Sequence, residues 1–418
     1  MWWFGWAAAA EVRELTLEEA MAMLPEAPEL RIAGGRADAA DGVARQVAAA
    51  WQPVVAVKGS YVHNDHEVVL SFADLFAQLP VPIEAPGDAT LQPLEAWTLS
   101  GSLQVPLVAP TQWLEASAAH RQAEGADRAV EEQILGMQAG LVSASAGVEA
   151  AEGLLAASER ALESAIEHQH ATEVARAAGT ATAVDALTAE AQVARRKGEL
   201  VTARQGLEDA REALGELLGL EGPARVVFPT EDPAVGEPQR RPLLDAAEAE
   251  LAAANTRVDA AWSRHLPRID GYATALASTV PYPTSLKTAW KVGLDATFVL
   301  YDGGLRYGRL DQARADRAVA QATLEQRERQ VSREVRQADG DLAAAREALE
   351  LAEQQAALAA RAADIARRSY EAGTSSALVA RDADTEAFRA DVGAVAARAR
   401  LRTAVAAARR ARGEVGGW

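Results

Sequence analysis

The sequence predicts a mainly helical chain with a few membrane-type strands, in which a unit of two strands and one long helical hairpin occurs twice. Three observations predict this fold. The chain has 418 residues, of which 49% are hydrophobic and 24% charged, and it is rich in alanine, as long helices are. A heptad seam runs without a slip through residues 331–370. The same seam occurs 194 residues earlier, from Met137 to Arg176, so the chain is a duplication.

The second seam contains no charged residue, and its spacing alternates between four and three. Alanine occupies most of its positions, which lets helices approach closely. Its members are Val331, Val335, Ala338, Leu342, Ala345, Leu349, Ala352, Ala356, Ala359, Ala363, Ala366 and Tyr370.

Charge and cysteine content exclude several classes of protein. The formal net charge of −18 makes nucleic acid a poor partner, because phosphate binding needs clusters of lysine and arginine. The absence of cysteine removes disulfides, thiolate nucleophiles and cysteine-based zinc sites. No apolar run reaches the ~18 residues that a spanning helix needs, but spanning strands give a weaker signal.

The first repeat is expected at residues 11–220. Residues 1–10, which include three tryptophans, are interpreted as a remnant of an export signal or a disordered end. Short helices are expected at residues 14–23, with Thr16 as cap, and 29–50. Two strands, near residues 55–61 and 97–107, precede a long helix at residues 111–178, and a helix at residues 182–219 returns along it.

A connection at residues 221–241, rich in proline, leads to the second repeat at residues 242–418. This repeat is expected to contain a helix at 243–263, strands at 269–279 and 290–300, a second long helix, and a returning helix at 376–412. Gly179 and Gly373 are predicted to end the two long helices.

The strands have one apolar face, for which a lipid contact is predicted. Soluble sheets alternate in the same way, so a half-buried strand is the alternative. Four strands cannot close a barrel, and open edges are not tolerated in lipid, whereas three chains would supply twelve strands. Such strands, continued by a hollow helical tube, would form a conduit. The predicted lipid-facing residues are Trp97, Leu99, Leu103, Trp290, Val292, Leu294 and Phe298.

Three stretches resemble TolC-type outer-membrane efflux proteins. The first is Leu-Thr-Leu-Glu-Glu-Ala at residues 15–20, followed by Trp51-x-Pro53 and Ser60-Tyr61. The second is the strand that ends in Phe-Val-Leu-Tyr-Asp-Gly-Gly-Leu-Arg at residues 298–306. The third is the turn Ala-Gly-Thr at residues 178–180 with its partner at 372–374. The order and duplication of these motifs are more specific than any one of them.

The resemblance implies a homotrimer with a 12-stranded barrel among outer-membrane lipid and an α-helical tunnel in the periplasm of a bacterial cell. It also implies that the hairpin ends form an aperture where a periplasmic adaptor protein and an inner-membrane transporter dock, so Gly179, Thr180, Gly373 and Thr374 become docking candidates. Family tips close through an Asp six residues after the first glycine and an Arg two residues after the second.

The aperture residues match the family only in part. Asp185 occupies the first Asp position, whereas Ser375 stands at the Arg position and Val379 at the second Asp position. Asp185 is a candidate for tuning ions or gating, and the alternative is an ordinary acidic residue in the first turn of a helix.

The histidines and carboxylates form no catalytic or metal constellation in the sequence. His168 and His170 are expected to be solvated, and His63 and His66 to lie in a polar loop. No P-loop or dinucleotide pattern surrounds Gly303 and Gly304, so neither an enzyme nor a cofactor is expected.

The expected function is that of a passive trimeric duct in a tripartite efflux system. An exporter of proteins or polysaccharide, as in type I secretion, would have the same architecture. The alternative from another class is a soluble coiled-coil scaffold, which would bury the apolar strand faces under its own helices.

Overall fold

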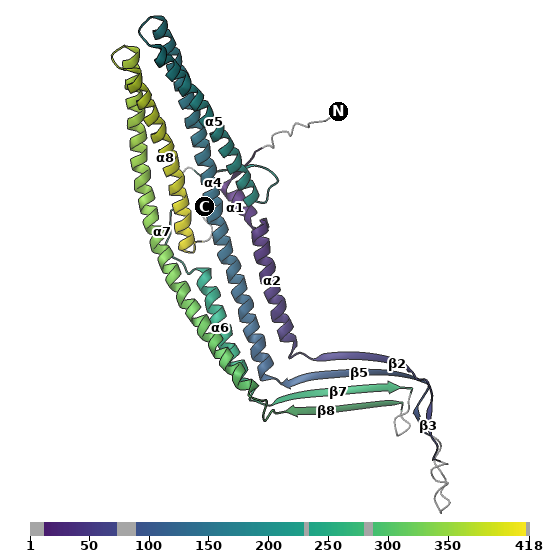
Figure 1. The fold of residues 1–418 in the computed structure, drawn as a ribbon. Helices are drawn as coiled ribbons and strands as arrows, with labels where there is room; N and C mark the ends of the chain where they lie inside the picture. The colour runs from purple at the N-terminus through teal and green to yellow at the C-terminus, as the bar shows by residue number, and fades with distance from the viewer. Residues whose placement is uncertain (1–11, 73–88, 230–233, 280–286, 415–418) are drawn as a thin grey trace, which may run out of the picture. The chain divides into compact units, whose positions relative to one another are not determined.

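The computed structural model describes residues 12–72, 89–229, 234–279 and 287–414 of the protein. Long helices and one main sheet make up the structure, as Figure 1 shows, so the predicted fold class is confirmed. The residues expected to be an export-signal remnant lie outside the described part.

The chain forms two compact units. One comprises Met1–Ala39, Glu124–Glu248 and Ala322–Trp418, and the other comprises Ala40–Ala123 and Ala249–Gln321. Each unit contains segments from both sequence repeats, so the boundaries of the compact units differ from those of the repeats. The repeat boundaries remain a prediction.

The first unit is built mainly from the two helical hairpins. α4 (Pro110–Ala177) and α5 (Ala183–Leu217) form one hairpin, and α7 (Leu305–Glu371) and α8 (Ala377–Ala411) form the other. α4 has 68 residues, which makes it about 100 Å long at 1.5 Å per residue. The helix ends agree with the predicted ones to within one or two residues.

The heptad seam of α7 lies against the rest of the first unit. All twelve of its members are buried or half-buried, with Leu342 at 6% and Ala345 at 1% exposure. In α4 the seam stays in contact as far as Thr172, which is fully buried, and is lost at the exposed Arg176. Burial therefore follows the pattern that predicted these helices.

The larger apolar core of the first unit joins the amino-terminal elements to the hairpins. α1 (Leu17–Met23), η1 (Leu24–Glu26) and α2 (Pro28–Ala49) precede the main sheet in the sequence, and Leu17 and Leu24 pack with Leu141 of α4 and Leu214 of α5. As predicted, Thr16 caps α1. Its hydroxyl accepts a hydrogen bond from the Glu19 amide at 3.2 Å, and the Glu19 carboxylate accepts one from the Thr16 amide at 2.8 Å.

The predicted first helix started too early. Residues 13–16 form the strand β1 (Arg13–Thr16), which pairs in parallel with β6 (Ala224–Val227) inside the segment predicted as a connection. Strands of four residues are too short to show an alternating pattern, and their stability comes from the core beside them. Leu15 and Val226 contribute to that core.

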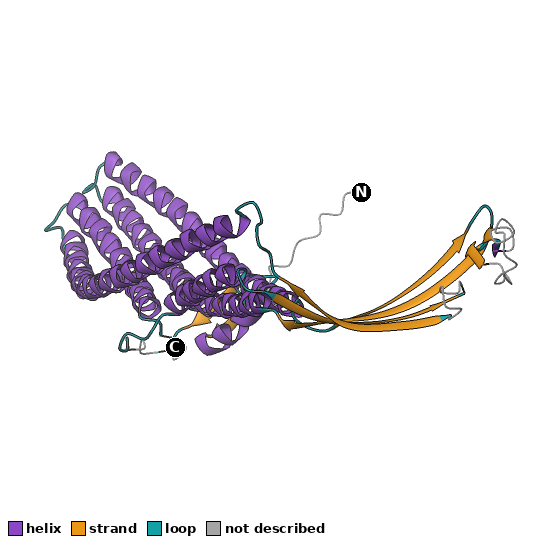
Figure 2. Cartoon of the chain, turned by 90° about the horizontal axis from the view of Figure 1, so that it is seen from below, coloured by secondary structure: helices purple, strands orange, loops and turns teal. Residues whose placement is uncertain are grey.

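The second unit contains the main sheet, in the order β2-β5-β7-β8, with every neighbouring pair antiparallel. The strands are β2 (Val54–His63), β5 (Glu95–Val108), β7 (Arg268–Ser278) and β8 (Thr288–Thr297). Figure 2 shows them side by side in a sheet that curves along its length. α6 (Pro242–Ser263) precedes β7, and a small hairpin of β3 (Val68–Leu70) and β4 (Ala89–Gln92) was not predicted.

The predicted last strand was three residues too long. β8 ends at Thr297, so Phe298 lies beyond the sheet. The partner strand explains this difference, because Thr297 pairs with Arg268, the first residue of β7. The preceding Pro267 has no amide hydrogen to extend the ladder.

Among the described residues, one helix has the length and apolar composition of a membrane-spanning helix, contrary to our expectation. It is α4, and 44% of the stretch concerned is buried within the protein. Alanine raises its hydropathy, and its seam packs against other helices, as in the core helix of a helical bundle.

Candidate functional site

The main sheet has one apolar and one polar face, fixed by strand register. Residues directly opposite each other on neighbouring strands share a face. Leu99 lies opposite Gly59 and Ala277, and Leu103 lies opposite Val55 and Ala273. The apolar face carries six of the seven predicted lipid-facing residues, namely Trp97, Leu99, Leu103, Trp290, Val292 and Leu294.

The apolar face is uncovered. Trp290 is 79% exposed and Val292 and Leu294 are each 69% exposed, which is far above the exposure of a strand that is half-buried in a soluble sheet. The scaffold alternative required these residues to lie under helices, which they do not. A continuous apolar surface of this size needs a partner, either lipid or protein.

Aromatic side chains lie at both ends of the sheet. At the end that carries the connecting loops, the ring of Tyr61 lies 4.6 Å from that of Trp97. At the helical end, Trp51 precedes β2, and Trp113 and Trp262 lie in the adjoining turns of α4 and α6, all at least 38% exposed. Aromatic residues at two levels, flanking an apolar band, are typical of strands that cross a membrane.

The junction from β8 into α7 is held by Asp302. Its carboxylate accepts hydrogen bonds from the amides of Gly304 at 3.2 Å and Arg306 at 3.1 Å, and it forms an ion pair with the Arg306 guanidinium at 3.0 Å. Gly303 and Gly304 have φ of 70° and 92°, which glycine adopts without strain. The motif therefore turns the chain from strand to helix.

The two hairpin turns have the same design. Gly179 has φ of 78° and Gly373 has φ of 72°, and each ends its long helix. The Thr180 amide donates to the Ala175 carbonyl at 2.9 Å, and the Thr374 amide donates to the Ser369 carbonyl at 2.8 Å. The four docking candidates thus form two matching, exposed turns.

Asp185 and Val379 lie in the first turns of the returning helices, and Ser375 lies one residue before the cap of α8. Asp185 makes a capping box with Thr182, whose amide and hydroxyl donate to its carboxylate at 2.9 and 2.7 Å. These bonds lower the pKa of Asp185, chiefly through the Thr182 hydroxyl. Val379 donates its amide to the Ser376 hydroxyl at 3.4 Å, and Ser375 is half-buried and uncharged.

A polar cluster between the two hairpins was not predicted. The Ser164 hydroxyl donates to the Asp384 carboxylate at 3.2 Å, and the Thr172 and Tyr370 hydroxyls are 3.3 Å apart. Ser164, Asp384 and His168 line a cavity of about 290 Å³. The cluster joins α4 to both helices of the second hairpin through polar contacts.

His168 belongs to this cluster, so the expectation of a solvated side chain was wrong. Its ring centroid is 5.2 Å from that of Tyr370, and burial lowers the pKa of His168 despite the attraction of Asp384. His170, two residues away, is exposed as expected. The sequence places both histidines on the same helix, and only the packing of the second hairpin distinguishes them.

Acid is expected to destabilise the hairpins through His168. Because its pKa is below the ordinary 6.5, the unfolded chain binds more protons in the interval between the two values, and stability falls as pH drops through it. His168→Gln should reduce the loss of thermal stability between about pH 7.5 and about pH 5.5. The exposed His170→Gln is the matched control, and an equal change in both variants would contradict this assignment.

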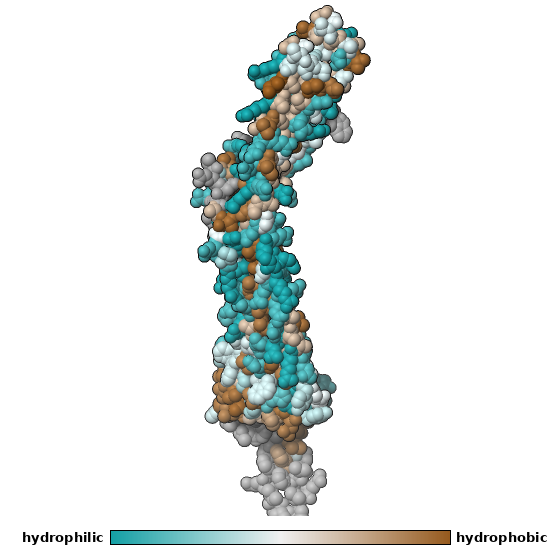
Figure 3. Space-filling model, turned by 90° about the vertical axis from the view of Figure 1, so that its left-hand side faces the viewer, coloured by the Kyte–Doolittle hydropathy of each residue, from teal (hydrophilic) through white to brown (hydrophobic). Residues whose placement is uncertain are grey.

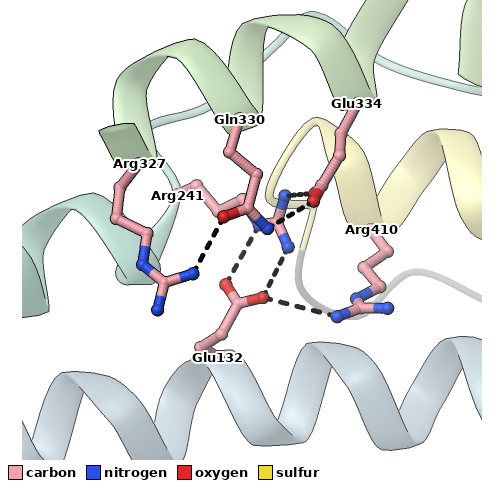
Figure 4. A network of polar contacts seen from close by, with 6 residues as sticks. All are labelled: Glu132, Arg241, Arg327, Gln330, Glu334 and Arg410. Atoms are coloured by element: carbon pink, nitrogen blue, oxygen red, sulfur yellow. Dashed lines mark hydrogen bonds and ion pairs between the residues drawn. The ribbon is translucent and has the colours of Figure 1, made fainter. Parts of the chain in front are cut away.

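A second buried network, shown in Figure 4, lies where α6 begins. The Arg241 side chain is 2% exposed and donates to the Glu132 carboxylate of α4 at 2.6 and 3.1 Å. It also forms an ion pair with Glu334 of α7, which accepts from Gln330 at 2.7 Å. The Arg410 guanidinium of α8 lies 3.7 Å from Glu132. One arginine therefore ties the start of α6 to both long helices.

His63 is the last residue of β2, so the expected polar loop begins after it and holds His66. Both histidines have acidic neighbours. His66 Nδ1 lies 2.7 Å from Asp65, and His63 Nδ1 lies 3.8 Å from Glu95, with all four side chains exposed. Among the described residues, no group of three or more His, Cys, Asp or Glu side chains could hold a metal ion.

Two uncharged stripes remain exposed on the hairpins. On α7 the stripe has heptad spacing beside the buried seam, with Leu351 at 58%, Leu358 at 65% and Ile365 at 64% exposure. On α5 the spacing is again four and three, and the members are Val184, Leu187, Ala191, Ala194, Gly198 and Val201. Figure 3 shows apolar surface running lengthwise along the helices between hydrophilic margins. Exposed heptad stripes indicate further helices as partners.

The sequence profile of the family described as outer membrane efflux protein matches residues 21–220 and 237–414. The chain belongs to the outer membrane efflux protein family. The recognition made from the three motifs is thereby confirmed, and the match covers both repeats. The comparison with curated proteins found no matching sequence.

Solved structures of outer-membrane channels have the same fold. The outer-membrane channel OprN aligns with a TM-score of 0.80 at 24% identity, over 96% of this chain and 90% of its own. VceC from Vibrio cholerae aligns with a TM-score of 0.79 at 20% identity, over 95% and 96% of the two chains. The CmeC channel from Campylobacter jejuni aligns with a TM-score of 0.80 at 15% identity, over 95% and 85%.

Family and fold together identify an outer-membrane efflux channel and do not favour the scaffold alternative. They are those of channels and not of enzymes. Two features that bear on this function were missed in the sequence, the exposed stripes and the buried polar clusters. The signal for the stripes in the sequence is a second line of uncharged residues with heptad spacing, beside the buried seam.

Proposed function

We propose that three copies of this chain form a passive duct through the outer membrane. In this assembly the sheets close into a 12-stranded barrel and the hairpins form a tunnel in the periplasm. Substrate would arrive from an inner-membrane transporter through a periplasmic adaptor protein that docks on the turns at Gly179, Thr180, Gly373 and Thr374. The transporter supplies the energy, so the duct itself needs no cofactor.

The observation that carries this proposal is the sheet with two open edges and an uncovered apolar face. Among the described residues, β2 pairs only with β5 and β8 only with β7, so both edge strands have unused backbone groups. Unpaired backbone groups are not tolerated in lipid, and closing the sheet into a barrel would pair them. The four strands alternate in direction, so β2 of one copy can pair with β8 of the next in the same antiparallel manner.

The polar face of the sheet sets a lower limit on the number of copies. Two chains would give eight strands, and barrels of that size fill their interior with side chains. The polar face here carries the charged side chains of Lys58, Asp270, Lys291 and Asp295, which need water or ionic partners. Three chains give twelve strands and room for water, in agreement with the trimer that the family resemblance implies.

The exposed stripes of the hairpins support the same assembly. The stripe on α7 of one copy can pack against the stripe on α5 of the next, because both are uncharged and have heptad spacing. Such a head-to-tail contact closes a ring when the rotation between copies fits a whole turn. The ring would be hollow, because each helix would pack with one face against its own chain and with another against the neighbouring copy, and neither contact fills the centre.

Reconstitution tests the duct. Protein extracted from membranes with detergent is expected to have the mass of three chains and to produce discrete conductance steps in planar lipid bilayers. Recovery of a monomer without detergent, from the soluble fraction, would overturn the proposal.

We also propose that Asp185 of the first hairpin, with Ser375 and Val379 of the second, lines the aperture of the duct. Asp185→Ala should lower the cation preference of single channels, because it removes one negative charge per chain at a narrow opening. The capping box gives the carboxylate a second role, so Thr182→Ala is the control that disturbs the cap and keeps the charge. Equal effects of both variants would assign Asp185 to capping alone.

A further inference from the structure

The polar face of the main sheet carries charge in a definite order along the strands. Three consecutive rows of residues near the loop end each contain one lysine. Lys287 lies opposite Ser278, whose amide donates to the Lys287 carbonyl at 2.8 Å. Lys58 lies opposite Ser100 in the next row, and Lys291 lies opposite Thr274 in the third.

The other members of these rows are uncharged. They are Ser60, Thr98 and Ser278 in the first row, Ser100, Leu276 and Ala289 in the second, and Ala56, Ser102 and Thr274 in the third. Among the described residues of the strands, acidic residues appear on this face only toward the helical end, where Asp270 lies directly opposite Asp295 and forms an ion pair with Arg268 at 2.8 Å. The three lysines of this face are therefore separated along the strands from its acidic residues, whose one ion-paired cation is Arg268.

These three positions carry lysine, although nearly all other basic residues of the chain are arginine. The chain has 42 basic residues but only four lysines, and three of them are Lys58, Lys287 and Lys291. Arginine forms fixed, two-pronged pairs with carboxylates, and most ion pairs of the helices use it, whereas lysine presents a mobile and strongly hydrated charge. A mobile charge suits repeated, brief contact with a passing solute.

The packing around Lys291 keeps its amine on the polar face. Its Nζ atom lies 5.5 Å from the centroid of the Tyr272 ring, a cation–π contact. That ring lies over Gly293 so closely that a Cβ atom there would be 2.5 Å from the tyrosine hydroxyl. Gly293 thus makes room for the ring, and the ring supports the lysine.

We propose that Lys58, Lys287 and Lys291 form an anion-attracting section in the bore of the barrel, near its outer mouth. This inference rests on the proposed function, since only closure of the sheet turns the polar face into a bore and brings nine lysines together. The chain as a whole is acidic, with a net charge of −18, so the section is a local reversal of charge. Walls of low dielectric constant around charges of one sign concentrate the opposite ions. The solutes favoured at the exit are organic and inorganic anions.

Block of single channels by a trisulfonated pyrene dye tests the assignment. The dye is added on the side of the connecting loops, and the triple variant K58Q/K287Q/K291Q is compared with the wild type. Removal of nine positive charges is expected to weaken the block about tenfold and to move the reversal potential in a KCl gradient toward cation preference. K197Q, on α5 of the helical unit, is the matched control and should behave like the wild type.

The outcomes separate the two proposals. Channels that open normally in the triple variant but show unchanged block and unchanged reversal potential would overturn the lysine assignment and leave the duct intact. Absence of channels from wild-type and variant proteins alike would overturn the duct itself, and the lysine section with it. Weaker block in the triple variant, with unchanged block in K197Q, supports both.

Discussion

Replacement of Leu351 and Leu358 by glutamate is expected to dissociate the three-chain assembly while the hairpins stay folded. Both leucines are more than half exposed in the single chain and belong to the uncharged stripe of α7. Burial of a leucine contributes about 1.5–3 kcal/mol, and the double variant loses two such contributions in each of three contacts. It also places unpaired carboxylates in an apolar contact, which costs more than the lost burial.

Ala357→Glu is the matched control, because Ala357 is exposed on the same stretch of α7 but outside both heptad lines. The detergent-solubilised Ala357→Glu variant should keep the mass of a trimer, whereas L351E/L358E should have the mass of a monomer. Circular dichroism checks that the helical content is unchanged. A trimer in L351E/L358E would show that the stripe is not the contact between copies.

Arg241→Ala is expected to destabilise the helical unit by about 3 kcal/mol or more. The change leaves the carboxylates of Glu132 and Glu334 without their main cation, and a buried charge left unpaired costs about 3–5 kcal/mol. The loss should appear in thermal or denaturant unfolding of the whole protein. The contact between α6, α4 and α7 should loosen before the hairpin turns do.

Arg240 supplies an unusually close control. It precedes Arg241 in the sequence and forms ion pairs with Asp245 and Glu248, but its side chain is 56% exposed. Exposed ion pairs contribute about 0–1 kcal/mol, so Arg240→Ala should have a small effect. Similar losses of stability in the two variants would contradict the role given to the buried network.

Most of the fold could be predicted because it repeats long periodic patterns. The heptad seam of α7, its copy in α4 and the two turn glycines fixed both hairpins. The alternation in β5 and β8 fixed the two faces of the sheet, since a period of two assigns each side chain to a face. The register between strands then added Lys58 and Lys291 to one polar face, which no single strand reveals.

The remaining features depend on contacts between distant segments, which local sequence does not encode. β1 and β6 have four residues each and pair across more than two hundred residues of chain. Arg240 and Arg241 are neighbours of the same type, and only tertiary packing buries one and exposes the other. His168 and His170 differ for the same reason. The end of β8 at Thr297 was set by Pro267 on the partner strand.

The closure of β2 against β8 of a neighbouring copy is tested most directly by disulfide cross-linking. The chain has no cysteine, so a pair introduced on the two edge strands, such as Val57→Cys with Val292→Cys or Leu294→Cys, reacts without background. Within one chain these strands are separated by β5 and β7, about 14 Å at the usual strand spacing, which is too far for a disulfide. Oxidation in membranes is expected to give covalent species that end at three chains for at least one register. Absence of cross-links in every register, or ladders that continue beyond three chains, would contradict the twelve-stranded barrel.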